Sequence, residues 1–306
     1  MVLHVAPDET PDQGLRRMAL AQLDLAVEML AMENGAVSPS EAIHEVRKAL
    51  KRLRALLRLL RDELGERTYE RESALLRETG QSLARARDAA VLLSTLDDLI
   101  ARHPGKLAGS RGVLRLRRRL QHERDGAAEL ALAGATHAGS LAELRAMRER
   151  VERWRLAEPG AIEAIEPALE RLYGKGRARL RRAAQAKGER RRAGSLHEWR
   201  KRVKDLRYAA EMLGAGKVAK RADELGELLG EEHDLAVLAQ RVRRDAKATR
   251  ASGASKPPGR RSRKQLLRLI SRRRGELRKR ALRDGERLYR RKPTRFVRRM
   301  RKAATR

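Results

Sequence analysis

The chain reads IHEVRKALKRLR over residues 43–54, and it reads LHEWRKRVKDLR over residues 196–207. We refer to these two stretches as the first motif and the second motif. Both place one His, two Arg and two Lys at the same offsets, with apolar residues between them. A pattern that recurs within one chain indicates a repeated structural unit. Because the repeated positions are charged as well as apolar, we expect a repeated site in addition to a repeated core.

Each motif has the periodicity of an amphipathic helix, with an apolar face and a basic face when residues are placed at 100° intervals. The apolar faces consist of Val46, Leu50, Leu53, Leu57 and Leu60 in the first helix, and of Leu196, Trp199, Val203, Leu206 and Leu213 in the second. The basic faces consist of His44, Arg47, Lys48, Lys51, Arg54 and Arg58 in the first helix, and of His197, Arg200, Lys201, Lys204 and Arg207 in the second.

The basic face of the first helix carries no acid between His44 and Arg58. A solvent-exposed helix face usually mixes both signs of charge and gains i,i+4 pairs, whereas like charges at these spacings repel. A bound anion would remove that repulsion, so we interpret the two basic faces as anion-binding, with a solvated basic surface as the alternative. The second face is less purely basic, because Asp205 stands at the position of Arg52. Glu211 stands at the position of Arg58.

The composition indicates a polyanionic partner. The formal net charge is +32 over 306 residues, and the isoelectric point is about 11.4. Nucleic acid, an anionic membrane surface and an inorganic polyanion are the candidates. Only 2% of the residues are aromatic, and proteins that bind single-stranded nucleic acid usually stack bases on aromatic side chains. The composition therefore disfavours the recognition of bases and leaves the binding of phosphate groups.

The sequence predicts neither a cofactor nor a metal site. It contains no cysteine, which excludes disulfides and thiolate ligands. His44 and His197 do not belong to zinc-protease motifs, because Lys48 and Lys201 stand four positions later. We recognise no signal peptide and no run of the roughly 18 apolar residues that a membrane span needs. We therefore expect a cytoplasmic protein that does not contact membranes.

Ala, Leu, Arg and Glu, which favour helices, dominate nearly the whole chain, and no segment alternates as a strand would. The sequence therefore predicts an all-α fold. A first helix is expected over about residues 12–33. A second is expected from Pro39 to about Leu64, opened by a capping box of Ser38 and Glu41.

Glycine and proline predict the later boundaries. A capping box of Ser195 and Glu198 is expected to open the second motif helix. Asp88 and Asp234 each precede an apolar run, so we expect each to cap a helix or to pair with an arginine. Further breaks are expected at residues 103–105, 134, 158–160 and 214–216, and a flexible basic loop is expected over residues 251–261, with two more helices after it.

The two motifs resemble those of the CHAD family, the conserved histidine α-helical domain. Further landmarks support the resemblance along the chain from about residue 10. These landmarks are Arg87-Asp88, His233-Asp234, Tyr173 with Arg177, Lys204 with Arg207-Tyr208, and Leu288-Tyr289 followed by Lys292-Pro293 and Phe296.

The resemblance implies two similar helical bundles related by a pseudo-two-fold axis, with a basic cavity or channel between them. We place the bundles at residues 10–157 and 161–306. The resemblance to the CHAD family also implies binding of inorganic polyphosphate and association with polyphosphate granules. Because no segment resembles the triphosphate-tunnel catalytic domain that often accompanies this family, we expect a stand-alone binding protein and not an enzyme.

The expected polyphosphate site comprises the two basic faces and four residues outside them. Those four residues are Tyr173, Arg177, Arg181 and Lys292. A further basic strip, for which we favour a solvated surface, consists of Arg115, Arg118, Arg119 and His122. The main alternative function is non-specific binding of nucleic acid. An enzyme acting on polyphosphate is a third hypothesis, and it would need an acidic metal-binding cluster that we do not find in the sequence.

Overall fold

A computed structural model describes residues 9–31, 37–133, 135–155, 161–252 and 259–304. The described residues form helices and contain no strand, which confirms the predicted all-α fold. The helices are α1 (Pro11–Ala31), α2 (Pro39–Leu59), α3 (Arg61–Leu64), α4 (Glu66–Ser82), α5 (Ala84–Arg102), α6 (Pro104–Leu107), α7 (Arg111–Ala131), α8 (Ala135–Glu152), α9 (Ala161–Gln185), α10 (Glu189–Met212), α11 (Gly216–Ser252), α12 (Arg260–Leu288) and α13 (Pro293–Ala304).

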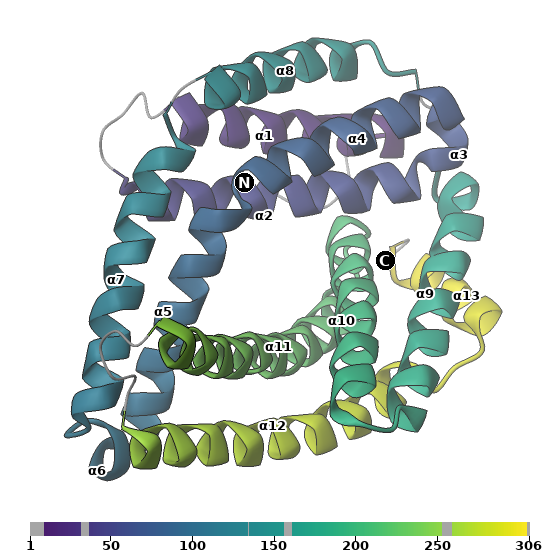
Figure 1. Ribbon diagram of the computed structural model, residues 1–306. Coiled ribbons are helices and arrows are strands. Elements are labelled where there is room, and N and C mark those ends of the chain that lie inside the picture. The colour runs from purple at the N-terminus through teal and green to yellow at the C-terminus, as the bar shows by residue number, and fades with distance from the viewer. Residues whose placement is uncertain (1–8, 32–36, 134, 156–160, 253–258, 305–306) are drawn as a thin grey trace.

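The helices are arranged as a four-sided frame (Figure 1). One side consists of α1, α2, α4 and α8, and α5 and α7 form the next side. Helix α12 forms the third side with α11 running inside it, and α9, α10 and α13 form the fourth side. The two motif helices, α2 and α10, therefore lie on adjacent sides of the frame, and they pack against each other.

The first motif helix begins as the sequence predicts. The Ser38 hydroxyl accepts a hydrogen bond from the backbone N–H of Glu41 at 3.4 Å, and the Glu41 carboxylate accepts one from the Ser38 N–H at 3.1 Å. This reciprocal pair is a capping box, and it satisfies two N–H groups that the helix itself leaves free. Helix α2 ends at Leu59, earlier than expected, and the short α3 then continues to Leu64, where Gly65 adopts a φ of +74°.

The second motif helix begins earlier than the sequence predicts. The capping box expected from Ser195 and Glu198 is wrong, because α10 begins at Glu189 and both residues lie inside it. Gly188 precedes the helix with a φ of +76° and turns the chain there. Gly194 therefore sits within the helix, at a cost of about 1 kcal/mol relative to alanine.

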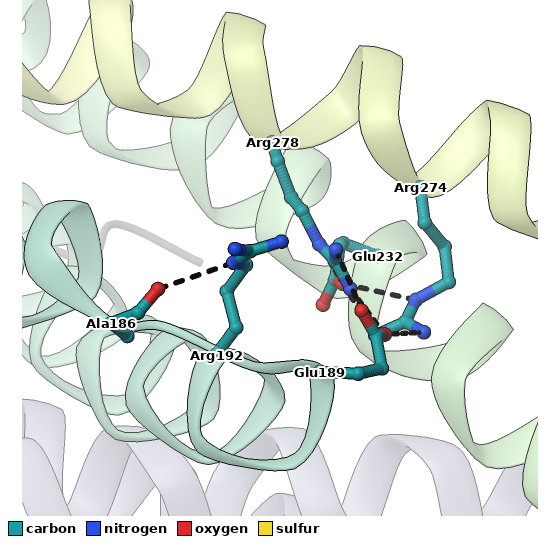
Figure 2. A network of polar contacts seen from close by, with 6 residues as sticks. All are labelled: Ala186, Glu189, Arg192, Glu232, Arg274 and Arg278. Carbon is teal, nitrogen blue, oxygen red and sulfur yellow. Dashed lines mark hydrogen bonds and ion pairs between the residues drawn. The ribbon is translucent and has the colours of Figure 1, made fainter.

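Contacts to distant elements hold this early start in place (Figure 2). The Glu189 carboxylate accepts hydrogen bonds from Arg278 at 2.6 and 3.0 Å, and it also contacts Arg274. Both arginines belong to α12, and both also donate to Glu232 of α11. This network joins the start of α10 to two later helices, and such tertiary contacts routinely override local propensity.

Most of the remaining predicted boundaries agree with the structure. A break separates α5 from α6 at His103, and Gly214, with a φ of +66°, follows α10. Two helices, α12 and α13, follow the basic loop as expected, but the loop is shorter than predicted, because residues 251–252 belong to α11 and residues 260–261 to α12. The predicted breaks at residues 134 and 158–160, and residues 253–258 of that loop, lie outside the described residues.

The apolar faces of both motif helices are buried. Every one of the ten apolar residues assigned to these faces is less than 10% exposed. Two hydrophobic clusters form the core, and each contains residues from both halves of the chain. In one cluster Leu53 and Trp199 are buried together, and in the other Leu96 and Leu116 are buried with Leu266. The division into bundles at residues 10–157 and 161–306 stays a prediction.

Candidate functional site

A cavity of about 490 Å³ lies between the two motif helices and helices α5 and α11. We call it the central pocket, because these four helices surround the middle of the frame in Figure 1. Its lining contains nine Arg and Lys side chains and four carboxylates. The basic residues are His44, Arg47, Lys48, Lys51 and Arg52 from α2, Arg87 and Arg102 from α5, and Arg200, Lys204 and Arg207 from α10.

The pocket thus brings together seven of the residues that the sequence predicts for the site, from motifs 153 positions apart. These seven are His44, Arg47, Lys48, Lys51, Arg200, Lys204 and Arg207. The amphipathic pattern explains why. Burial of the apolar face of each motif helix turns its basic face away from the core and toward the shared cavity.

Lys51 and Lys204 are the most strongly perturbed cations in the pocket. Burial, together with repulsion from Lys204, Arg47 and Arg200, lowers the pKa of Lys51 to about 7. Arg87 of α5 adds to that repulsion. Burial and Arg200 lower the pKa of Lys204 to about 8, against an opposing effect of two acids of α11, Glu227 and Asp234. Lowered pKa values mean that the protein alone does not supply enough negative charge for these ammonium groups.

Several guanidinium groups around the pocket keep unused donors. Arg47 donates through Nη1 to the carbonyl of Gly80 at 2.6 Å, which fixes its orientation. Its buried Nε has no hydrogen-bond partner among the described residues, and the same holds for the Nε of Arg52 and of Arg200. Gly230 of α11 leaves room for Arg200, since a Cβ there would lie 3.2 Å from Nη2. Buried donors are normally satisfied, so these groups indicate a place for an anionic ligand.

The four carboxylates of the pocket are Asp98 of α5 and Glu227, Glu231 and Asp234 of α11. Glu231 accepts hydrogen bonds from Arg273 at 2.7 and 2.8 Å, and it lies 3.5 Å from Arg102. Burial raises the pKa of Asp234, while Arg200 and Arg87 act in the opposite direction. Glu227, Glu231 and Asp234 thus face cations of the protein. The four acids reduce the positive charge of the pocket without cancelling it.

Asp88 and Asp234 do not cap helices. Asp88 lies in the second turn of α5 and Asp234 in the middle of α11, so this part of the prediction is wrong. Attraction between Asp88 and Arg47 opposes the effect of burial on the pKa of that arginine. Asp234 is likewise attracted by Arg200 and Arg87, which act to lower its pKa. The alternative, pairing with an arginine across the fold, therefore describes both residues better.

Four residues of the motif helices do not line the pocket. Arg58 instead donates to Asp205 of α10 at 2.8 Å, and Arg54 lies half-buried beside Arg58. Lys201 forms an ion pair with Glu198. The fourth, His197, packs against His233 of α11, with ring centroids 4.4 Å apart.

The four weaker candidates also lie outside the pocket lining. Tyr173 is buried in the core, where its ring stacks on Phe296 at 3.9 Å and its hydroxyl donates to the Leu288 carbonyl at 3.0 Å. Arg177 is half-buried, whereas Arg181 and Lys292 are exposed. Leu288 and Phe296, two of the landmarks near the chain end, therefore contribute to the packing of α9, α12 and α13 around Tyr173.

The additional basic strip lies on α7, away from the pocket lining. Arg115, Arg118 and His122 are exposed, and Arg119 forms an ion pair with Asp245 of α11. This placement agrees with the solvated surface that we favoured for the strip.

Sequence reasoning missed three cations of the pocket, Arg52, Arg87 and Arg102. Arg87 was quoted as a landmark but was not assigned to the site. Arg52 sits at the boundary between the two helix faces, and its Nη1 donates to Gln22 of α1 at 3.3 Å. Arg102 lies at the end of α5, in no repeated pattern. A signal was available for Arg87 alone, in the Arg-Asp dipeptide that parallels His233-Asp234.

Two kinds of feature are absent from the described part of the chain. It contains no group of three or more His, Cys, Asp or Glu side chains arranged to hold a metal ion. None of its helices combines the length and the apolar character that crossing a bilayer requires.

Comparisons with known proteins agree with the resemblance. The sequence model of the CHAD domain matches residues 21–243. Two curated relatives from Mycobacterium tuberculosis, the uncharacterized proteins MT2285 and Rv2226, are each 29% identical over 239 residues. The alignment covers 74% of this chain and 45% of each relative, so the chain spans about half the length of these proteins.

Two solved structures share the fold. PptA from Streptomyces chartreusis has a TM-score of 0.64 and 17% identity, and the match covers 92% of this chain and 100% of that chain. The crystal structure of the CHAD domain from the plant Ricinus communis has a TM-score of 0.59 and 21% identity, and that match covers 90% and 88%. At these identities the likeness concerns the fold alone.

Proposed function

The chain belongs to the CHAD domain family, and from this premise we propose that the central pocket binds inorganic polyphosphate. The family is associated in general with polyphosphate binding. The observation that carries the proposal for this chain is the convergence of both motif helices on one pocket. There, the cations outnumber the acids, and three buried arginine Nε groups have no hydrogen-bond partner among the described residues.

The chemistry of the lining suits a chain of phosphates. Polyphosphate offers charged oxygens and no base, sugar or methyl group, so its receptor needs only well-placed cations. Arginine contributes paired N–H donors to phosphate oxygens, and lysine contributes a compact point charge. Arg47 and Arg200 supply the first kind of contact, and Lys51 and Lys204 supply the second.

The size of the pocket favours a single flexible chain. Its volume of about 490 Å³ is small beside a nucleic acid duplex, in which the major groove alone is about 12 Å wide. The pocket therefore suits one chain of phosphates better than a duplex. A single chain can contact α2 and α10 at the same time, because both helices line the pocket.

We propose binding without hydrolysis. The pocket acids face protein cations, as Glu231 faces Arg273 and Arg102, and this arrangement opposes the gathering of a divalent metal. We also propose that the two motifs are copies of one ancestral unit, with the units at residues 10–157 and 161–306. A protein with this site would associate with polyphosphate granules.

The test measures the affinity for long-chain polyphosphate by calorimetry at about 150 mM salt, where weak general attraction is screened. Lys51→Gln/Lys204→Gln removes two buried charges without introducing new ones. Hydrogen bonds to charged groups contribute about 1.5–3 kcal/mol each, so we expect the double variant to lose about 100-fold in affinity or more.

A matched control separates the pocket from the general field of the protein. Lys106 and Lys217 are exposed and lie outside the pocket lining, so Lys106→Gln/Lys217→Gln makes the same change of net charge. We expect this control to bind nearly as the wild type does, with the same helical content by circular dichroism. Equal losses in the two double variants would show that the pocket is not the site.

A further inference from the structure

The two faces of α12 differ in how their charge is neutralised. Three arginines on the inner face are paired with acids of α11 and α10. Arg273 donates to Glu231 at 2.7 Å, and Arg274 donates to Glu232 at 3.0 Å. Arg278 donates to Glu232 at 2.8 Å, and Figure 2 shows how it and Arg274 converge on the carboxylates. The positive charge of these three arginines is therefore compensated within the protein.

The outer face of α12 carries basic residues without such partners. We call five of them the outer stripe: Arg261, Lys264, Arg268, Lys279 and Arg283. All five are exposed, and at 100° per residue they fall within about 100° on one side of the helix. None of the five forms an ion pair with any residue that the structure describes. Arg272 lies on the same side of the helix, between Arg268 and Lys279, but it is paired with Glu276 at 3.3 Å.

The outer stripe is straight and long. Arg261 and Arg283 are 22 positions apart in one helix, which at 1.5 Å per residue is about 33 Å. Helix α12 forms an outer edge of the frame in Figure 1. The stripe lies on the side of α12 opposite the buried Leu266, Ile270 and Leu277, and none of its residues lines the central pocket. A rod of uncompensated cations on an outer edge fits a rigid, linear polyanion.

We propose that the outer stripe of α12 binds the phosphate backbone of double-stranded DNA, at a surface separate from the polyphosphate pocket. A duplex presents a stiff row of phosphates, and proteins bind it without sequence preference by placing Arg and Lys against them. Five such contacts would release counterions with a salt slope of about −4.5, at about −0.9 per phosphate.

Single-stranded nucleic acid fits this surface less well. Its binding relies on aromatic side chains that stack on the bases. The chain has seven aromatic residues. Six of them are buried, and the seventh, Tyr69, is half-buried with Arg61 over its ring. The stripe therefore offers charge without a stacking surface.

An anionic membrane also fits less well. Helices that bind membrane surfaces bury an apolar face in the lipid boundary. In α12 the apolar side is already buried in the core, where Leu266, Ile270 and Leu277 lie. The large hydrophobic residues that are exposed in the described chain, Leu114 and Leu130, both belong to α7.

The experiment titrates a fluorescent DNA duplex of random sequence with full-length protein and follows anisotropy over a series of salt concentrations. The test variant is Arg268→Glu/Lys279→Glu/Arg283→Glu. A matched control, Arg67→Glu/Lys106→Glu/Arg115→Glu, changes the net charge equally at exposed positions scattered over α4, α6 and α7. Melting temperatures of all proteins are compared first, because these exposed side chains are not expected to affect stability.

We expect the test variant to lose at least tenfold in duplex affinity, and its salt slope to become shallower by about 2.7. Its affinity for polyphosphate should change no more than that of the control. The proposal fails if test and control variants bind the duplex equally. It also fails if Lys51→Gln/Lys204→Gln weakens duplex binding more than the test variant does. Loss of binding to anionic lipid vesicles with unchanged duplex binding would assign the stripe to a membrane and would equally overturn the proposal.

Discussion

The two motif helices carry nearly the same sequence but present different parts of it to the pocket. Helix α2 contributes residues from His44 to Arg52, whereas α10 contributes residues from Arg200 to Tyr208. When the two motifs are aligned, the segment of α10 that lines the pocket begins almost one helical turn later than the segment of α2 that lines it. Lys48 and His44 line the pocket but their counterparts do not, and Arg207 lines it although its counterpart Arg54 does not.

The shift indicates which part of the repeat forms the proposed site. Two pairs of equivalent positions line the pocket from both helices, Arg47 with Arg200 and Lys51 with Lys204. One flanking position of the second motif instead holds the two helices together. Asp205, at the position of Arg52, pairs with Arg58 of the other motif helix at 2.8 Å and with Arg202 at 3.0 Å.

Asp205→Asn should destabilise the protein by about 3 kcal/mol, because it breaks a largely buried pair and leaves cations without their partner. Asp205 is buried, and it joins the two motif helices. Urea unfolding followed by circular dichroism measures the loss. Asp97→Asn is the control, since Asp97 pairs with Arg117 at the surface, where such pairs contribute less than about 1 kcal/mol. Equal losses would mean that Asp205 has no special structural role.

Arg47→Gln and Arg200→Gln should each weaken polyphosphate binding by about tenfold to hundredfold, as expected for one charged hydrogen-bonding contact. The two losses should be similar, because both residues occupy the position that the helices share. Calorimetric titration of each single variant gives the comparison. A large effect from only one of them would show that a single motif helix makes the site.

Polyphosphate affinity should fall about tenfold or more as the pH rises from about 6.5 to 9, since a change of one pKa unit corresponds to 1.36 kcal/mol. Lys51, with a pKa of about 7, and Lys204, with a pKa of about 8, lose their charge in this range. Burial lowers the pKa of His44, the histidine of the pocket lining, so its charge contributes only at lower pH.

The ligand-free protein should show the opposite trend. Because the folded pKa values of both lysines lie below the unfolded value, the unfolded chain binds more protons above pH 7, and stability rises with pH. Lys51→Gln/Lys204→Gln should flatten both profiles. A pH dependence that survives in this variant would assign the titration to other groups.

The smallest effect is expected for Lys48 and Lys201, which occupy equivalent positions in the two motifs. Lys48 lines the pocket and Lys201 does not, yet each pairs with a glutamate three positions earlier. Lys48→Gln should lower polyphosphate affinity by about threefold, the scale of a partly exposed ion pair, and Lys201→Gln should leave it unchanged. Titrations of both variants in the same buffer decide between them. Identical affinities of the two variants would contradict the different roles that we assign to Lys48 and Lys201.

The sequence predicted the secondary structure and the direction of the motif faces better than it predicted the limits of the site. Periodicity alone placed the apolar faces in the core, and the Ser38 capping box is fully local. The start of α10 escaped prediction because Arg274 and Arg278, more than 80 positions away, hold Glu189. Arg102 escaped for the same reason, since only the packing of α5 against α11 brings it to the pocket.

The composition of the second hydrophobic cluster has a consequence for synthesis on the ribosome. Leu116 of α7 is buried in that cluster with Leu266 of α12, which lies 150 positions later in the chain. At a synthesis rate of about 5–20 residues per second, Leu266 would be added about 8 to 30 seconds after Leu116. Until then, α12 could not cover the apolar sides of α5 and α7. During this interval the nascent chain would expose a hydrophobic surface that α12 later covers.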